Sequence, residues 1–160
     1  MTAETPVSIR PAEAADAEAI AALILSAFEP YRGRIHPTPS ALSETGESIG
    51  KRLATGLGFV AETRERMIGC VLATFNSPGE LYVGRLAVVP QWRRRGLARR
   101  LMARAEELAR ERGCAAMSLG VRIALGENIA FFERLGFRFV REERHPGYSQ
   151  PTYISMAKPL

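Results

Sequence analysis

Hydrophobic and polar residues alternate along the chain in two distinct rhythms. Period-two or continuous apolar runs predict strands at residues 7–10, 58–62, 67–75, 81–89, 115–121, 137–140 and 152–157. Apolar residues three and four positions apart predict helices that begin at Asp16 and cover about 43–55, 96–112 and 127–135. This order predicts a mixed α/β (α+β) fold with a largely antiparallel central sheet of six to seven strands and about four flanking helices.

The most regular of these helices is predicted at residues 96–112. Its apolar stripe consists of Leu97, Leu101, Ala105, Leu108 and Ala109. Gly113 follows where a terminating glycine commonly stands. The preceding strand ends at Pro90, so the chain must pass from a buried strand to a strong helix through a short turn.

The composition is that of a soluble globular protein. The chain has 160 residues, of which 46% are hydrophobic and 24% are charged. At about 150 residues per domain, this length predicts one domain that spans residues 1–160. Cys70 and Cys114 are too few for a disulfide framework and lie in apolar surroundings, so we expect two reduced, buried thiols.

Neither the amino terminus nor any apolar segment indicates a membrane. The first residues lack the basic and apolar regions of a secretion signal. The longest apolar run, residues 19–28, is too short to cross a bilayer. We therefore expect a cytoplasmic protein with no membrane partner.

Positive charge is concentrated rather than spread. The chain carries 22 Lys and Arg against 17 Asp and Glu, a formal charge of +5. The arginines gather at 93–95, 99, 100 and 104, and aromatic residues are not interleaved with them apart from Trp92. This pattern favours a local anion site over a broad nucleic-acid surface, so we expect no nucleic-acid partner.

The turn between the strand and the helix is the best candidate for that anion site. The first N–H groups of a helix have no partners inside it, and the helix dipole makes that end positive. Gly96 and Ala98 leave room for a close approach to the backbone, and Arg94, Arg95 and Arg99 add full charges. A pyrophosphate fits such a site, although a solvated arginine run before a surface helix has the same spacing.

These residues also resemble a known family. Arg93-x-x-Gly96-x-Ala98, after the strand Leu86-Ala87-Val88, is similar to the acyl-CoA signature R/Q-x-x-G-x-G/A of the GNAT N-acetyltransferases. Asn-Ile-Ala-Phe-Phe-Glu-Arg-Leu-Gly-Phe at 128–137 resembles the family run N-x-x-x-Y-E-k-l-G-F. Ile9-Arg10-Pro11-Ala12, followed by Asp16, resembles the family's first strand and helix entry.

The resemblance implies a GNAT fold whose sheet splays between the strand ending at Val89 and the strand starting near Ala116. It implies that acetyl-CoA is the co-substrate and that its pantetheine arm lies in this gap, with a backbone N–H at about Val88 steadying an oxyanion. The cofactor-binding residues that it implies are Leu86, Ala87, Val88, Arg93, Arg94, Arg95, Gly96, Leu97, Ala98, Arg99, Asn128 and Phe132. Asn128 can equally be a helix-start residue. No metal is implied.

The residues that move protons are less defined. In the family a Glu on the strand before the cofactor turn serves as base, and Glu80 is the nearest carboxylate, although Tyr82 occupies the usual position. Phe132 stands where the family commonly has the tyrosine acid. The resemblance leaves Tyr148 as a substitute acid, with His145 as another, and both can also be walls of the acceptor site.

The acceptor amine is expected to contact the segments 29–44 and 143–152. Tyr31, His36, Glu44 and His145 are the polar or aromatic residues expected to bind this substrate, and Glu44 could hold a cationic amine or serve only as a helix-start charge. We therefore hypothesise an N-acetyltransferase that moves an acetyl group directly to a primary amine of a small molecule or peptide. A non-catalytic acyl-CoA sensor and an RNA-binding domain are the alternatives, and the sequence is compatible with a homodimer.

Overall fold

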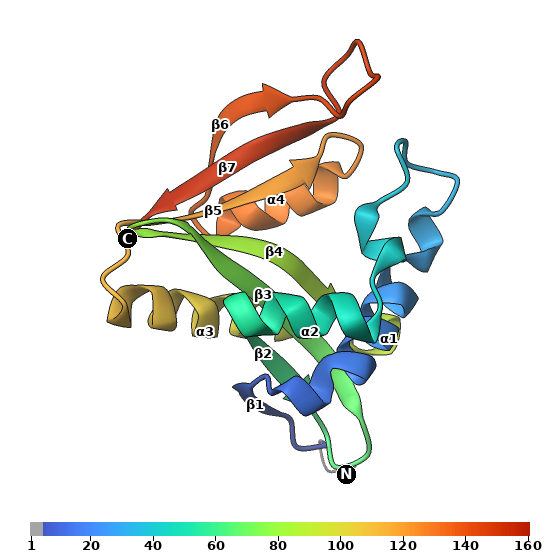
Figure 1. Cartoon of the computed structure of the whole chain (residues 1–160), viewed down its shortest axis with the longest axis vertical. Coiled ribbons are helices and arrows are strands. Elements are labelled where there is room, and N and C mark those ends of the chain that lie inside the picture. Colours follow the sequence, from blue (N-terminus) through green and yellow to red (C-terminus); the bar gives the residue numbers. More distant parts are fainter. Residues whose placement is uncertain (1–4) are drawn as a thin grey trace.

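Seven strands form one sheet in a computed structural model, which describes residues 5–160 of the chain (Figure 1). The strands are β1 (Ser8–Pro11), β2 (Leu57–Glu62), β3 (Met67–Ser77), β4 (Glu80–Val88), β5 (Ala116–Arg122), β6 (Arg138–Glu143) and β7 (Tyr153–Pro159). Their order is β1-β2-β3-β4-β5-β7-β6. All neighbours are antiparallel except β4 and β5, which are parallel.

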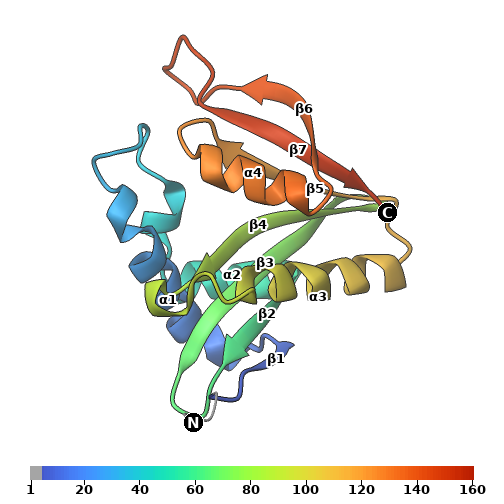
Figure 2. The ribbon, with the colours of Figure 1, turned by 180° about the vertical axis from the view of Figure 1, so that it is seen from behind.

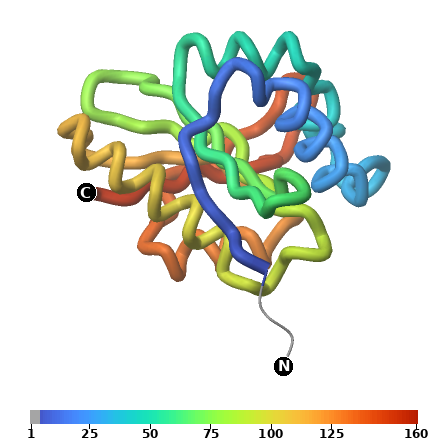
Figure 3. Tube along the Cα trace, turned by 90° about the horizontal axis from the view of Figure 1, so that it is seen from below, coloured from blue at the N-terminus to red at the C-terminus, as the bar shows by residue number. Residues whose placement is uncertain are grey.

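Four α-helices cover the two faces of this sheet. They are α1 (Ala17–Phe28), α2 (Gly46–Thr55), α3 (Leu97–Glu111) and α4 (Gly126–Arg134). Figure 3 shows α2 on one side of the strands and α3 on the other, and in Figure 2 α3 and α4 lie in front of the sheet. One continuous set of buried apolar side chains fills the space between these layers, so the expected fold class is confirmed.

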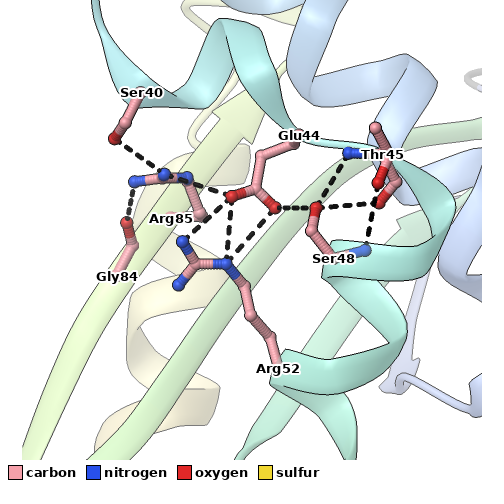
Figure 4. Close-up of polar contacts among 7 residues, drawn as sticks. All are labelled: Ser40, Glu44, Thr45, Ser48, Arg52, Gly84 and Arg85. Carbon is pink, nitrogen blue, oxygen red and sulfur yellow. Dashed lines mark hydrogen bonds and ion pairs between the residues drawn. The ribbon is translucent and has the colours of Figure 1, made fainter.

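The predicted helix at about 43–55 is the one element that differs in kind. Residues 40–43 form a short 3-10 turn, the backbone is extended at Glu44 and Thr45, and α2 begins only at Gly46. A capping box explains this start, because Thr45 Oγ1 accepts from the N–H of Ser48 at 3.1 Å and Ser48 Oγ accepts from the N–H of Thr45 at 2.8 Å. The extended residue Glu44 thereby points its side chain toward the sheet (Figure 4).

The predicted splay of the sheet is confirmed, and its origin is a β-bulge. β4 and β5 pair only from Glu80 opposite Ala116 to Val83 opposite Leu119. On the other side of β4, Ala73 of β3 faces Val83 while Leu72 faces Arg85, so Gly84 is an extra residue. A bulge bends and twists its strand. β4 therefore leaves β5 immediately after the bulge and continues to Val88 against β3 alone.

Helix α3 is held against the sheet by the predicted apolar stripe. Leu97, Leu101, Ala105 and Ala109 are buried, together with Met102. The helix comes close to β3 at Gly69, where a Cβ atom would lie 3.1 Å from Leu101 Cδ1. This packing determines where the amino end of α3 stands relative to the end of β4.

Within residues 5–160, no helix combines the length and the apolar character that crossing a bilayer requires.

Removal of the Leu101 side chain tests whether α3 depends on this contact. Leu101 is fully buried, so Leu101→Ala should lower the free energy of unfolding by about 2–5 kcal/mol, because a cavity is left between α3 and β3. Its exposed neighbour Arg100 is the control, and Arg100→Ala should change that value by less than about 0.5 kcal/mol. Urea denaturation measures both, and equal effects would contradict the packing described.

Candidate active site

The turn between β4 and α3 presents a row of unpaired backbone donors. Two residues there have a left-handed backbone conformation, Arg94 at φ 62° and Gly96 at φ 75°, and α3 begins immediately afterwards. The N–H groups of residues 94–99 find no hydrogen-bond acceptor within residues 5–160. Six consecutive N–H groups at a positive helix end could together hold a polyvalent anion such as a diphosphate.

The arginines of this turn have different surroundings. The Arg93 guanidinium donates to the carbonyl of Val88 at 3.3 Å and to that of Ala27 at 3.2 Å, so it ties the turn to the end of α1. Arg95 stacks over Trp92, with its guanidinium carbon 4.7 Å from the ring centroid. Arg94 and Arg99 are exposed. Their charges are therefore available to an anion bound at the unpaired N–H groups.

The other expected cofactor residues lie on β4 and on α4. Leu86, Ala87 and Val88 lie on the part of β4 that no longer pairs with β5. Across the splay, α4 lies against β5 on the same face as α3 (Figure 2). Phe132 of α4 is partly buried against Phe137, with 5.9 Å between ring centroids, while Asn128 is exposed one turn earlier.

On the opposite face, Glu44 is the centre of a cluster that joins the α1–α2 connection to β4 (Figure 4). Only 7% of Glu44 is exposed. Its carboxylate accepts from Arg52 at 2.9 Å, from Arg85 at 3.3 Å and from Ser48 at 3.0 Å. Burial alone would raise the pKa of Glu44, but these hydrogen bonds and the two positive charges outweigh it and lower the pKa. Glu44 is therefore ionised and already paired with two guanidinium groups.

Arg85 attaches this cluster to the bulge. Its guanidinium donates to the carbonyl of Gly84 and to Ser40 Oγ, each at 3.0 Å. Burial, followed by the charge of Arg52, lowers its pKa from the ordinary arginine value. Its Nε is buried without an acceptor within residues 5–160. The two arginines and one carboxylate together leave one uncompensated positive charge beside the splay.

Aromatic side chains meet over the point where β4 and β5 separate. A Cβ atom at Gly120 of β5 would lie 3.4 Å from the Tyr82 hydroxyl and 3.4 Å from the Tyr153 ring. Burial and the neighbouring Tyr153 raise the pKa of Tyr82, which therefore keeps its proton at neutral pH. The His145 ring lies 4.9 Å from the Tyr153 ring, and burial together with the charge of Arg122 lowers its pKa.

The two predicted acceptor segments converge at the end of β5. Arg122 Nη1 donates to the carbonyl of Pro37 at 2.8 Å, which pins the α1–α2 connection to this strand. His36 is exposed next to Pro37, and Tyr31 packs edge-to-face on Phe28. Tyr148, in the β6–β7 connection, is 36% exposed.

Glu80 lies at the other end of β4. It faces Ala116 in the paired part of the two strands and accepts a hydrogen bond from Ser77 Oγ at 3.2 Å. It is four positions from Gly84, on the order of 13 Å along a strand. Proton transfer between Glu80 and the splay would therefore need a relay.

Sequence reasoning did not single out Arg52, Arg85 or Tyr153. Arg85 carries a usable signal, because it is the one charged residue inside the apolar run 81–89. Arg52 and Tyr153 have none, since an arginine in a helix and a tyrosine in a strand are ordinary surface residues. Their position at the splay follows from the packing of α2 and β7.

The sequence profile of the Acetyltransferase (GNAT) family matches residues 20–137, the stretch that runs from α1 through the arginine turn to α4. The chain belongs to this family. The family resemblance found in the arginine turn and in α4 is thereby confirmed.

Curated relatives are similar over part of their length. The tRNA(Met) cytidine acetyltransferase of Yersinia pestis (strain D106004) is 36% identical over 75 residues, which are 47% of this chain and 11% of that protein. An uncharacterized N-acetyltransferase of Chlorobaculum tepidum is 30% identical over 88 residues, 55% of this chain and 54% of that protein. The chain thus spans about half or less of the relatives it matches.

Solved structures of N-acetyltransferases share the fold. The PaiA N-acetyltransferase of Thermoplasma acidophilum, in complex with coenzyme A, has a TM-score of 0.80 at 16% identity, with 97% of this chain and 99% of that chain covered. The ribosomal-protein-S18-alanine N-acetyltransferase of Escherichia coli has a TM-score of 0.72 at 24% identity, with 96% and 94% covered. The GNAT fold is therefore shown over nearly the whole chain.

The Glu44 cluster makes a prediction about stability and pH. Glu44→Gln leaves two guanidinium groups without their carboxylate and should lower the free energy of unfolding at pH 7 by about 3 kcal/mol. Because the pKa of Glu44 is lowered in the folded protein, its contribution is present above about pH 4.3 and is lost as the pH falls through the folded value. The difference between the wild type and Glu44→Gln should therefore shrink toward pH 3.

Glu47, in the first turn of α2, is the matched control. It pairs with Lys51 at 3.4 Å, but both side chains are about four-fifths exposed, at 81% and 78%. Glu47→Gln should change the free energy of unfolding by less than about 0.5 kcal/mol. Urea denaturation at pH 7 and pH 3 measures both variants, and a Glu44→Gln effect as small as that of Glu47→Gln would contradict the buried cluster.

Proposed function

We propose that this chain is an acetyl-CoA-dependent N-acetyltransferase that moves an acetyl group to a primary amine by direct transfer in a ternary complex. The observation that carries the proposal is the row of six unpaired N–H groups at residues 94–99, at the end of the strand that splays from β5. A coenzyme A diphosphate matches these donors and the exposed charges of Arg94 and Arg99. No metal is needed for this binding or for the transfer.

The pantetheine arm of the co-substrate would lie along the unpaired edge of β4. Backbone groups of Leu86 and Val88 stand where β5 no longer supplies partners. Amide groups of an extended ligand can satisfy such an edge in the way that an added strand does. The thioester would then sit near the bulge, between Phe132 of α4 and the cluster around Glu44.

The transfer makes one bond and breaks one. The amine nitrogen attacks the thioester carbonyl carbon, the C–N bond forms, the C–S bond breaks, and the sulfur leaves with its electron pair. The amine loses one proton and the coenzyme thiolate gains one. A proton acceptor near the splay is favoured over Glu80, which lies at the paired end of β4. We therefore propose that His145 accepts the amine proton through water and that Tyr148 donates a proton to the coenzyme thiolate.

A covalent cysteine intermediate is opposed by the environment of the thiols. Cys70 is fully buried, and burial raises its pKa to about 12. A thiol with such a pKa stays protonated at neutral pH and is a poor nucleophile. Cys114 is also buried, at 7% exposure. The buried thiols therefore favour direct attack of the amine on the thioester.

Phe132 stands where the family commonly has the tyrosine acid, so a non-catalytic sensor is the second candidate function. A non-catalytic acyl-CoA-binding module would bind coenzyme A without releasing thiol from acetyl-CoA in the presence of any amine. Incubation of the chain with acetyl-CoA and a panel of amines, followed by titration of free thiol, separates the two functions. Turnover with one amine establishes the enzyme, and tight binding without turnover establishes the sensor.

Gly96 and Gly113 provide a matched pair for testing the diphosphate site. They flank α3, have φ of 75° and 72°, and a Cβ atom at either position would meet no atom of the chain within 4 Å. Each change to Ala should therefore cost a similar backbone strain, on the order of 1 kcal/mol. Gly96→Ala should in addition weaken coenzyme A binding by about tenfold or more, because its Cβ enters the anion site.

Isothermal titration with coenzyme A measures the affinity of both variants, and thermal unfolding measures their stability. Equal affinities for Gly96→Ala and Gly113→Ala would show that the diphosphate binds elsewhere.

The pH dependence of the rate tests the assignment to His145. In a plot of log kcat/KM against pH, the slope should be one at pH values below the pKa of the amine. At pH values that are also below the pKa of His145, which is lowered from 6.5, the slope should steepen to two. In His145→Gln the slope should remain one and kcat should fall about tenfold. Tyr148→Phe should also lower kcat, whereas Glu80→Gln should change it less than threefold.

Stopped or continuous thiol-release assays from pH 5 to pH 9 supply these slopes. A slope of two that persists in His145→Gln, or a larger loss in Glu80→Gln than in His145→Gln, would move the proton acceptor to Glu80.

A further inference from the structure

A small pocket lies on the α2 side of the sheet, directly beside the bulge. Its volume is about 250 Å³, below the range of about 300–1,000 Å³ that holds drug-sized ligands. It is bordered by Arg52 of α2, by Leu72, Ala73, Thr74 and Asn76 of β3, and by Tyr82 and Gly84 of β4. The pocket thus adjoins the point at which β4 leaves β5, on the face opposite α3, and suits a small molecule.

One edge of the Arg52 guanidinium is turned toward this point. Its Nε and Nη2 donate to Glu44, at 3.1 and 2.9 Å. Its Nη1 has no acceptor within residues 5–160 and lies 3.6 Å from the position that a Cβ atom of Gly84 would take. The Arg52 side chain is 36% exposed, so a ligand can reach it. Glu44 thus orients Arg52 while leaving one pair of N–H bonds for a ligand.

The charge around the pocket is positive. No carboxylate is among the residues that border it, and Glu44, the carboxylate that pairs with Arg52, is shared with Arg85. Arg122, at the end of β5, makes its hydrogen bond to a carbonyl rather than to an acid. A diamine or polyamine would be repelled here, whereas a carboxylate would form a charge-assisted hydrogen bond with Arg52.

From this geometry we infer that the acceptor is a short amino acid, whose carboxylate binds Arg52 Nη1 while its amine faces the splay. The inference rests on the proposed transfer, because it takes the acetyl group to lie in the splay beside Gly84. Arg52 Nη1 lies so close to Gly84 that the carboxylate and the amine must be neighbours, within about three bonds of each other. Long diamines and cationic antibiotics lack this arrangement.

Amino acids and their amides test this acceptor class directly. The amine of an amide is the less basic of the two, so more of it is unprotonated at neutral pH and simple reactivity favours the amide. With acetyl-CoA saturating, at least one amino acid should nevertheless show a kcat/KM at least 30-fold above that of its own amide. Putrescine and spermidine are the cationic acceptors in the panel, and their kcat/KM should be lower than that of this amino acid.

Two variants localise the effect. Arg52→Gln should lower kcat/KM for the amino acid at least 30-fold and for its amide less than threefold. Gly84→Ala would place a methyl group at ordinary contact distances, 3.6 Å from Arg52 Nη1 and 3.9 Å from the Leu72 carbonyl, so it should fold normally and yet block the carboxylate. The exposed Arg64, in the turn between β2 and β3 and not among the residues that border the pocket, is the control for net charge, and Arg64→Gln should leave both kcat/KM values unchanged.

The outcomes separate this inference from the proposed function. If amides or polyamines are acetylated as well as amino acids, or if Arg52→Gln affects acid and amide equally, the inference is wrong and the transferase stands. If coenzyme A binds but no amine is acetylated, the proposed transferase function is wrong. Calorimetry of amino-acid binding to the coenzyme-loaded protein then tests the pocket by itself. Binding of an amino acid that Arg52→Gln abolishes supports the carboxylate site, and absence of such binding overturns it.

Discussion

The parallel strands β4 and β5 share only four paired positions, and this short pairing defines the candidate site of the chain. Beyond Val83 and Leu119 the facing edges of β4 and β5 have no partner in each other, because Gly84 adds a residue to β4 and turns it away. Unpaired backbone groups are costly when they are buried, so such an edge favours a ligand that carries amide groups of its own. The same bend brings the end of β4 to the arginine turn and opens the opposite face beside Gly84.

Electrostatics on the two faces of the sheet have different origins. At the arginine turn the positive potential comes from backbone N–H groups and exposed guanidinium groups, which water screens when no anion is bound. On the other face it comes from two arginines held by one buried carboxylate. Glu44 stabilises this pair and also restricts it, because each guanidinium keeps a defined orientation only while the carboxylate is ionised.

Several parts of the site could be predicted from residues close together in the chain. The row of unpaired N–H groups proposed to bind an anion at 94–99 belongs to this group, since a strand, a turn with Gly96 and an amphipathic helix follow one another directly. Glu44 shows where this reasoning ends. A helix-start charge that could hold an amine was a fair expectation, but its carboxylate is paired with Arg85, which is 41 residues away in sequence. Arg93 similarly braces the end of α1 at Ala27, 66 residues away.

The sequence by itself determined the order of strands and helices, the family, and the donor-rich entry to α3. These are local properties, because hydrophobic periodicity and the unpaired N–H groups of a helix end depend on residues within a few turns of each other. Only the tertiary structure decided which charges neutralise each other, that Glu80 stands at the paired end of β4, and that Arg52 faces Gly84. Such contacts depend on strand register and on how helices pack, and neither is encoded in any short stretch of the chain.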